Sequence, residues 1–198
     1  MSPKPDISED RKNQILEAAT NVFSEKGISS ARMDDIASES GVSKGLLYWY
    51  FKSKGELVIA IAERFFNREM AAVKELAERE GSATILLQEF LEIMILDTRR
   101  IQPIMPLLFE FFALLIRKKG IHKVVGKVVS DMFTDLETIV ARGIEQGEFI
   151  QLDPHAASVA IRAVIEGTYI IWAYAPDQVD IEKHIRSGVM LILQGMLV

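Results

Sequence analysis

The stretch MDDIASESGVSKGLLYWYFKSK, residues 33–54, decides the expected fold of the N-terminal part of the chain. Ile36 and Ala37 belong to one short expected helix, and Leu47 belongs to a second. Gly41 lies between them and tolerates the left-handed backbone that a tight turn requires. Two short helices joined by such a turn form a helix-turn-helix unit, whose second helix enters the major groove of DNA.

The second helix of this pair has two different faces. Ser43 fits its N-cap, because the hydroxyl can accept a backbone N–H. On a helical wheel, the apolar residues Leu46, Leu47 and Tyr50 share one side. The other side carries Lys44, Gly45, Tyr48 and Trp49, which suit phosphates, close approach to the groove and thymine methyl groups. The alternative is an exposed aromatic patch that does not bind nucleic acid.

A third helix is expected directly behind the second. Ser53 and Glu56 have the S-x-x-E spacing of a capping box, which marks the start of a helix. A helix N-terminus carries partial positive charge, and Lys52 and Lys54 add to it. This segment therefore indicates a second place for DNA phosphates.

These motifs together resemble the tetracycline-repressor family of bacterial one-component regulators. The resemblance rests on GVSKG at residues 41–45, LYWYFKSK at residues 47–54, Phe23, Gly27 and the triplet DIA at residues 35–37. It extends over about residues 11–66, and it implies a dimeric, DNA-binding, ligand-responsive regulator. One departure is Tyr50, where the family often has His and a phosphate contact. The expected DNA-binding residues are Arg32, Ser43, Lys44, Gly45, Tyr48, Trp49, Tyr50 and Lys54.

Composition places this chain among cytoplasmic proteins rich in apolar residues. Hydrophobic residues make up 49% of its 198 residues, and the mean hydropathy is +0.16, which predicts a subunit interface or an internal pocket. No signal-peptide pattern is found, no uninterrupted apolar run reaches the ~18 residues of a membrane span, and there are no cysteines. Residues 1–55 have no net charge, because their eight Lys/Arg balance eight Asp/Glu. The net charge of −5 therefore comes from residues 56–198.

The predicted fold is all-α with two domains. Residues 8–55 form a three-helix DNA-binding domain, with the helix pair at about 33–52 and a first helix over residues 8–26 that ends at Gly27. Residues 56–198 form a helical ligand-binding and dimerisation domain. Helices are expected over residues 54–80, 83–100, 105–119, 121–146, 154–175 and 181–196, because Gly and Pro separate apolar stretches of helical periodicity.

The last two expected helices are apolar on more than one side, which predicts a homodimer. The first carries the small residues Ala156, Ala160, Ala163 and Gly167 on one side, and Ile161, Ile165, Thr168 and Trp172 roughly opposite. The second carries Ile181, Ile185, Gly188, Ile192 and Met196. The small-residue stripe and this last stripe are the expected dimer interface. The alternative is the core of a monomeric bundle.

Two carboxylates within apolar helices indicate a ligand pocket among the middle helices. Glu166 can pair with Arg162 one turn earlier, whereas Glu110 needs Arg99, Arg100 or a ligand. The candidate lining residues are Met94, Met105, Phe109, Glu110, Phe112, Phe133, Glu166, Tyr169 and Trp172. Such a site suits a large apolar or cationic molecule. Ordinary core packing is the alternative for each of these residues.

Nothing in the sequence indicates catalysis. It has no nucleophile elbow, Walker loop or dinucleotide-binding turn, and its three histidines lack metal-ligand spacing. We therefore expect no enzyme activity, cofactor, metal or membrane partner. The expected function is a regulator, more often a repressor in this family, that binds palindromic double-stranded operator DNA and is released by a small apolar effector. The alternatives are a helical ligand-binding or structural module without DNA binding, and a small helical enzyme.

Overall fold

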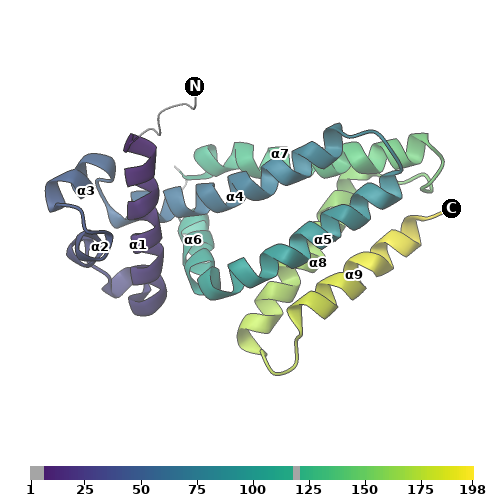
Figure 1. Cartoon of the computed structure of the whole chain (residues 1–198). Coiled ribbons are helices and arrows are strands. Elements are labelled where there is room, and N and C mark those ends of the chain that lie inside the picture. The colour runs from purple at the N-terminus through teal and green to yellow at the C-terminus, as the bar shows by residue number, and fades with distance from the viewer. Residues whose placement is uncertain (1–6, 118–120) are drawn as a thin grey trace. The chain divides into compact units, whose positions relative to one another are not determined.

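The computed structural model describes residues 7–117 and 121–198, which are helical almost throughout (Figure 1). The elements are α1 (Ile7–Ser30), α2 (Met33–Ser40), α3 (Lys44–Tyr50), α4 (Lys54–Glu78), α5 (Ala83–Ile101), η1 (Gln102–Ile104), α6 (Met105–Arg117), α7 (Ile121–Glu145), α8 (Pro154–Tyr174) and α9 (Ile181–Met196). Within these described ranges, the only extended pairing is an isolated bridge between Phe149 and Leu197. The predicted all-α class is confirmed.

The helix ends follow the glycines, prolines and caps expected from the sequence. As predicted, the first helix is interrupted at Gly27, whose φ of 73° and ψ of 154° are not helical, and a short second segment continues α1 to Ser30. Asp153 caps α8 by accepting from the N–H of His155 at 3.0 Å. Residues 118 and 119, the end of the helix expected over 105–119, lie outside the described residues, as do residue 120 and residues 1–6.

The chain divides into two compact units. The first unit contains α1, α2, α3, α4 as far as Phe66, η1 and α6. The second unit contains α4 from Asn67, together with α5, most of α7, α8 and α9. The boundary predicted between residues 55 and 56 falls inside α4, so that helix belongs to both units.

The core of the first unit forms where α1 packs against α2 and α6. Ile15, Ile36, Leu47 and Leu57 are completely buried there, which fixes the helix pair on α1. The wheel was wrong about Leu46, which is 37% exposed. Because α3 has only seven residues, its buried contact is centred on Leu47 rather than spread over a wider stripe.

In the second unit, α9 packs against α5 and α8. The contact between α8 and α9 is close, since a Cβ built on Gly188 would lie 2.5 Å from Cγ1 of Val164. Arg162 of α8 is buried and pairs with Glu166 at 3.1 Å, which confirms the predicted i,i+4 pair. Helical periodicity alone was therefore sufficient to identify this partner.

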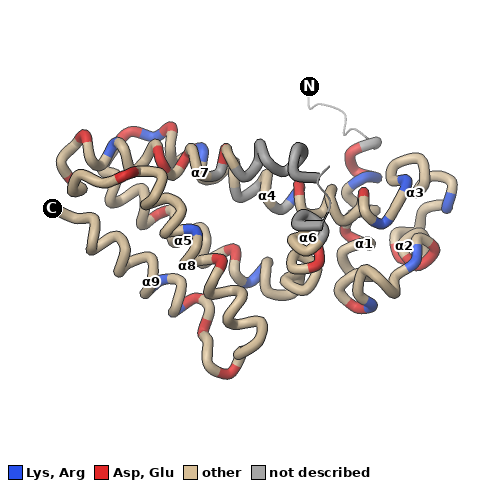
Figure 2. The backbone as a smooth tube through the Cα atoms, turned by 180° about the vertical axis from the view of Figure 1, so that it is seen from behind, with Lys and Arg blue, Asp and Glu red and all other residues tan. Residues whose placement is uncertain are grey.

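The predicted interface stripe on α9 is largely wrong. Ile181, Ile185 and Met196 are at most 5% exposed within the single chain, and Gly188 faces Val164. The reason is that α5 and α8 of the same chain cover this stripe. Exposed apolar residues lie instead at Val159, Ile170 and Tyr174 of α8 and Leu191 of α9, with Ala163 also exposed. Few charged positions interrupt α8 and α9 (Figure 2).

The first of these two helices also has the dimensions of a membrane span. Among the described helices, Pro154–Tyr174 alone is long and apolar enough, with a mean hydropathy of 1.3 over its best window. The core helices of water-soluble domains pass the same test, and this helix contains the Arg162–Glu166 ion pair. Its apolar character carries no argument for a membrane.

Candidate nucleic-acid interface

The turn of the helix pair has the geometry that its sequence predicts. Gly41 ends α2 in the left-handed region, with φ 66° and ψ 16°, and its N–H donates to the carbonyl of Ser38 at 3.2 Å. The Ser43 hydroxyl accepts from the N–H of Leu46 at 3.2 Å and thereby caps α3. These local bonds set the direction in which α3 leaves the turn.

The outer face of α3 is exposed and carries the residues expected to contact DNA. Tyr48 is 44% exposed and Trp49 is 66% exposed, whereas Leu47 is completely buried. Gly45 is exposed, and a Cβ built on it meets no described atom within 4 Å. Packing inside the protein therefore gives no reason for a glycine at this position. Open space beside a bare backbone is what close approach to a groove requires.

Further hydrogen bonds fix both helices of the pair. The amide of Gln14 on α1 donates to the carbonyl of Ser40 at 2.7 Å, at the end of α2. The Lys52 ammonium donates to the carbonyl of Tyr48 at 2.7 Å, at the end of α3. Lys52 thus satisfies a free carbonyl at a helix C-terminus.

The capping box at the start of α4 is present with one change. The Ser53 hydroxyl accepts from the N–H of Glu56 at 3.3 Å, as predicted. The Glu56 carboxylate accepts from the N–H of Lys52 at 2.7 Å, one residue before the expected Ser53. The carboxylate therefore closes the loop between α3 and α4 as well as the first turn of α4.

Tyr50 has the intermediate position that its two interpretations implied. Its ring is partly buried, lies edge-on to Trp49 with the centroids 4.7 Å apart, and is tilted against Phe51 at 6.4 Å. The phosphate contact expected from the family resemblance stays a prediction for this residue.

An acidic residue that the sequence reasoning missed lies on the same surface. The Asp34 carboxylate of α2 pairs with the Lys44 ammonium of α3 at 2.7 Å, and both side chains are exposed. Its neighbour Asp35 accepts from Lys26 at 3.0 Å and from the N–H of Arg32 at 2.9 Å. These two bonds, first the one from Lys26, lower the pKa of Asp35. The ion pair between Asp34 and Lys44 joins two helices, and its residues lie ten positions apart in the sequence. Spacing rules for pairs within one helix therefore do not predict it.

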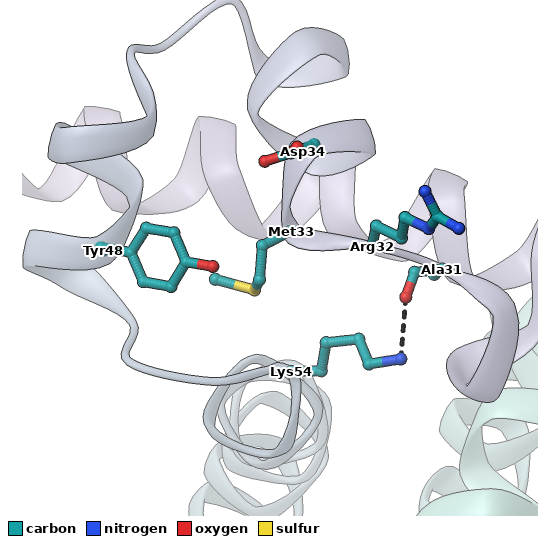
Figure 3. Close-up of a pocket in the computed structure, with 6 residues that line it drawn as sticks. All are labelled: Ala31, Arg32, Met33, Asp34, Tyr48 and Lys54. Carbon is teal, nitrogen blue, oxygen red and sulfur yellow. Dashed lines mark hydrogen bonds between the residues drawn. The ribbon is translucent and has the colours of Figure 1, made fainter.

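A recess of about 370 Å³ opens between α2, α3 and the start of α4 (Figure 3). The ring of Tyr48 extends across it toward the Met33 side chain, and Arg32 points away from the other side chains. The lining residues are Ala31, Arg32, Met33, Asp34, Tyr48 and Lys54. The recess thus joins three predicted DNA-binding residues, Arg32, Tyr48 and Lys54. The ammonium of Lys54 donates to three backbone carbonyls here. The sequence predicted a DNA phosphate as its partner, so these contacts differ from the expected one.

The residues of the predicted ligand pocket are distributed over both units. Met105, Phe109, Glu110 and Phe112 belong to the first unit, and Met94, Phe133, Glu166, Tyr169 and Trp172 belong to the second. Within the second unit, the Tyr169 hydroxyl lies 3.0 Å from the Thr98 hydroxyl, and the sulfur of buried Met94 is 3.8 Å from the guanidinium of Arg162. The prediction of a shared pocket stays a prediction.

The burial expected for Glu110 is wrong. Glu110 is exposed on α6, and the two arginines considered as its partners pair elsewhere. Arg99 contacts Glu182 at 3.4 Å, and Arg100 contacts Asp97 at 2.9 Å. An exposed carboxylate is solvated by water and needs no ligand charge, so the reason for expecting a cationic ligand disappears.

A second recess, of about 470 Å³, lies between α4 and α7 in the second unit. It is lined by Asn67, Met70, Ala71, Lys74, Asp131, Thr134 and Asp135. Burial, which outweighs nearby Lys74, raises the pKa of Asp135. None of the predicted pocket residues lines this recess. Its lining is polar, so the pattern of apolar residues in the sequence did not indicate it.

Comparison with known proteins places the chain in a family. A model described as "Bacterial regulatory proteins, tetR family" matches residues 15–61, and one described as "BetI-type transcriptional repressor, C-terminal" matches residues 85–194. The HTH-type transcriptional regulator TtgR of Pseudomonas putida is 29% identical, over 93% of this chain and 92% of that protein.

Two solved structures share the fold over nearly the whole chain. A complex of SmeT with triclosan superposes with a TM-score of 0.80 at 18% identity, covering 96% of this chain and 92% of that one. SmeT is the repressor of the Stenotrophomonas maltophilia multidrug efflux pump SmeDEF. FadR from Bacillus subtilis in complex with stearoyl-CoA has a TM-score of 0.74 at 22% identity, covering 93% and 99%.

The fold and the exposed face of α3 therefore define a helix-turn-helix transcriptional regulator. The chain belongs to the TetR family of bacterial transcriptional regulators. The predicted family, fold class and regulatory function are confirmed, and the matches do not support a helical module without DNA binding.

Proposed function

We propose that this protein is a cytoplasmic repressor that binds a palindromic operator as a homodimer and leaves it when a small apolar effector binds. The exposed face of α3 is the observation that carries the proposal. It presents a cation, a bare backbone and two aromatic rings at Lys44, Gly45, Tyr48 and Trp49, and the glycine packs against none of the described residues.

Each residue of this face has a separate part in DNA recognition. Lys44, together with Arg32 and Ser43, contacts phosphates, which fix the position of the protein along the duplex. Tyr48 and Trp49 reach the base edges, where apolar contact with thymine methyl groups gives sequence preference. Because one short helix contacts few base pairs, two copies on a two-fold symmetric site are needed for selectivity.

The exposed apolar stripe of α8 supports a dimer. Val159, Ala163, Ile170 and Tyr174 recur at helical spacing and remain exposed in the single chain, and Leu191 of α9 is 68% exposed. Contiguous exposed apolar residues mark interaction surfaces. Of the originally predicted interface, the α8 residues Ala156, Ala160, Ala163 and Gly167 are retained, whereas most of the α9 stripe is replaced by Leu191.

Release follows from a two-state mechanism in which α4 is the connection. The two recognition helices lie about one helical turn apart, roughly 34 Å, in the DNA-competent state. Effector binding in the second unit shifts α4, which belongs to both units, and changes that spacing. The coupling free energy is expected to be ~1–3 kcal/mol, and operator DNA must weaken effector binding by the same factor. An apolar effector agrees with the methionine and aromatic residues of the predicted pocket.

Substitution on the DNA face tests the proposal. Lys44→Ala and Tyr48→Ala should abolish sequence-selective binding and leave helical content and melting temperature nearly unchanged, because both side chains are exposed. Lys183→Ala, at an exposed position of α9, is the control and should bind operator normally. Selective binding that survives both substitutions on α3 contradicts the proposal.

The dimer is tested separately. Ala163→Glu places a charge in the apolar stripe of α8, which costs several kcal/mol if a partner buries it. We expect monomers by analytical ultracentrifugation and loss of operator binding, whereas Ile85→Glu, at an exposed position of α5, should stay dimeric. A wild-type protein that is monomeric at micromolar concentration contradicts this arrangement.

A further inference from the structure

Lys54, the first residue of α4, is bound to the connection between α1 and α2. Its ammonium donates to the carbonyl of Ile28 at 2.6 Å, of Ser29 at 3.0 Å and of Ala31 at 2.7 Å. Figure 3 shows the side chain extending below the recess to the Ala31 carbonyl. An ammonium has three N–H donors and no acceptor, so these three bonds use its full donor capacity.

The three carbonyls lie where α1 ends. Gly27 interrupts the helix at φ 73°, and the chain then makes one more turn before α2 begins at Met33. Carbonyls in a last helical turn lack partners within the helix and carry partial negative charge. A cation held by three of them stabilises this turn and fixes the point from which α2 starts.

We propose that Lys54 is a positioning residue that ties α4 to the α1–α2 connection, and that it acts on DNA binding through the orientation of the helix pair and not as a phosphate contact. A phosphate would have to displace carbonyls from the ammonium. A shift of the α4 N-terminus, in contrast, moves Ala31 with it, and Ala31 lies two residues before α2. The inference rests on the proposed function because it names the residue that connects α4 to the DNA-binding helices.

Charge and hydrogen-bond donation can be separated at this residue, because the sequence contains no cysteine. Lys54→Cys, alkylated in urea with 2-bromoethylamine and refolded, has a lysine-like ammonium with three donors. Alkylation with (2-bromoethyl)trimethylammonium gives the same charge with no N–H. The same two products at Lys44→Cys are the matched control, since Lys44 is an exposed ammonium on α3 with one acidic partner.

If Lys54 ties α4 to the α1–α2 connection, the two alkylated products should differ from each other at residue 54 but not at residue 44. At residue 54, the ammonium product should restore wild-type melting and operator affinity. The trimethylated product should melt roughly 3–10 °C lower and bind about tenfold more weakly or worse, because charge-assisted bonds are lost. At residue 44, both cationic products should melt alike and bind within about threefold of each other, because a phosphate is attracted by charge.

Two further readouts distinguish positioning from stability alone. Unmodified Lys54→Cys should leave the slope of log affinity against log salt unchanged, whereas Lys44→Cys should lower it by about one unit. In a Trp172→Phe background, Trp49 reports on α3. Its fluorescence anisotropy should fall in the trimethylated residue-54 product at 20 °C with helical content intact.

The proposal is overturned if the trimethylated residue-54 product melts and binds like wild type, if Lys54→Cys lowers the salt slope by about one unit, or if the Trp49 anisotropy is unchanged. Melting and anisotropy are measured on the free protein. They therefore test whether Lys54 ties α4 to the α1–α2 connection even if the wild-type protein binds no DNA. A wild-type protein that binds no DNA would refute the proposed function and not this inference.

Discussion

Gly45→Ala is expected to stabilise the protein and weaken its DNA binding, two opposite effects of one methyl group. A Cβ at this position meets no described atom within 4 Å, so the free protein gains no clash. Alanine is favoured over glycine in a helix interior by roughly 0.5–1 kcal/mol, and less in a first turn, where Gly45 lies. The melting temperature should therefore rise by at most about 4 °C.

The same methyl group occupies the space that a groove wall needs. Overpacking a close contact typically costs about 1–3 kcal/mol, which corresponds to a Kd roughly 5- to 150-fold higher. Thermal melting followed by circular dichroism gives the stability, and fluorescence anisotropy of a labelled operator at fixed salt gives the affinity.

Gly55→Ala is the matched control for this prediction. Gly55 is likewise the second residue of its helix, and a Cβ there would make only an ordinary contact of 3.7 Å with the Ser53 hydroxyl. It should gain similar stability and keep its operator affinity. The reasoning is refuted if Gly45→Ala binds operator like wild type, or if it melts below wild type.

Three other substitutions test separate parts of the structure. Asp34→Asn removes a negative charge and the partner of Lys44, so non-specific DNA affinity should rise by about three- to tenfold in a gel-shift titration. Gly188→Ala should lower the free energy of unfolding in urea by ~1–2 kcal/mol, because its Cβ would lie 2.5 Å from Val164. Glu148→Gln should cost ~1 kcal/mol, because the carboxylate accepts from the hydroxyl of Ser82 and the N–H groups of Ala83 and Thr84 at the start of α5.

The pH dependence of the last variant has a definite sign. Burial disfavours the charged form of Glu148, but the hydrogen bonds at the start of α5 outweigh it and lower its pKa. A carboxylate whose folded-state pKa is lowered contributes stability above its unfolded pKa and loses it as the pH falls through the folded value. Glu148→Gln should therefore differ most from wild type at neutral pH and converge with it in acid.

Contrary outcomes are equally definite for these variants. Unchanged non-specific affinity in Asp34→Asn means that the Lys44 ammonium does not contact phosphate. A Gly188→Ala protein as stable as wild type, but monomeric, would return Gly188 to the dimer interface. A constant difference between Glu148→Gln and wild type from neutral to acidic pH would show that the charge of the carboxylate is not what caps α5.

Local signals predicted the helices because each of them acts over a few residues. The left-handed Gly41 and the Ser43 cap appear as expected, and α8 begins at Pro154, where the helix over residues 154–175 was predicted to start. The Arg162–Glu166 pair was equally predictable from its spacing. Periodicity could not tell which partner covers an apolar stripe, and for this reason the α9 stripe was assigned to a second subunit when α5 and α8 cover it.

The sequence predicted which residues belong to the candidate site, but it did not predict which contacts they make. Exposure of Tyr48 and Trp49 followed from the wheel of a single helix. The pairing of Asp34 with Lys44, and the three carbonyls around Lys54, join segments that meet only after folding. From the sequence alone, a lysine at the expected start of a helix indicated a phosphate contact for Lys54.

Selection of bound fragments from a large pool of random double-stranded DNA tests the central claim most directly. The account predicts enrichment of one palindromic sequence by the wild-type protein, with half-sites centred about one helical turn apart, and no enrichment by the Tyr48→Ala variant. A pool that shows no sequence enrichment with the wild-type protein, or the same enrichment with both proteins, would contradict DNA recognition by the exposed face of α3.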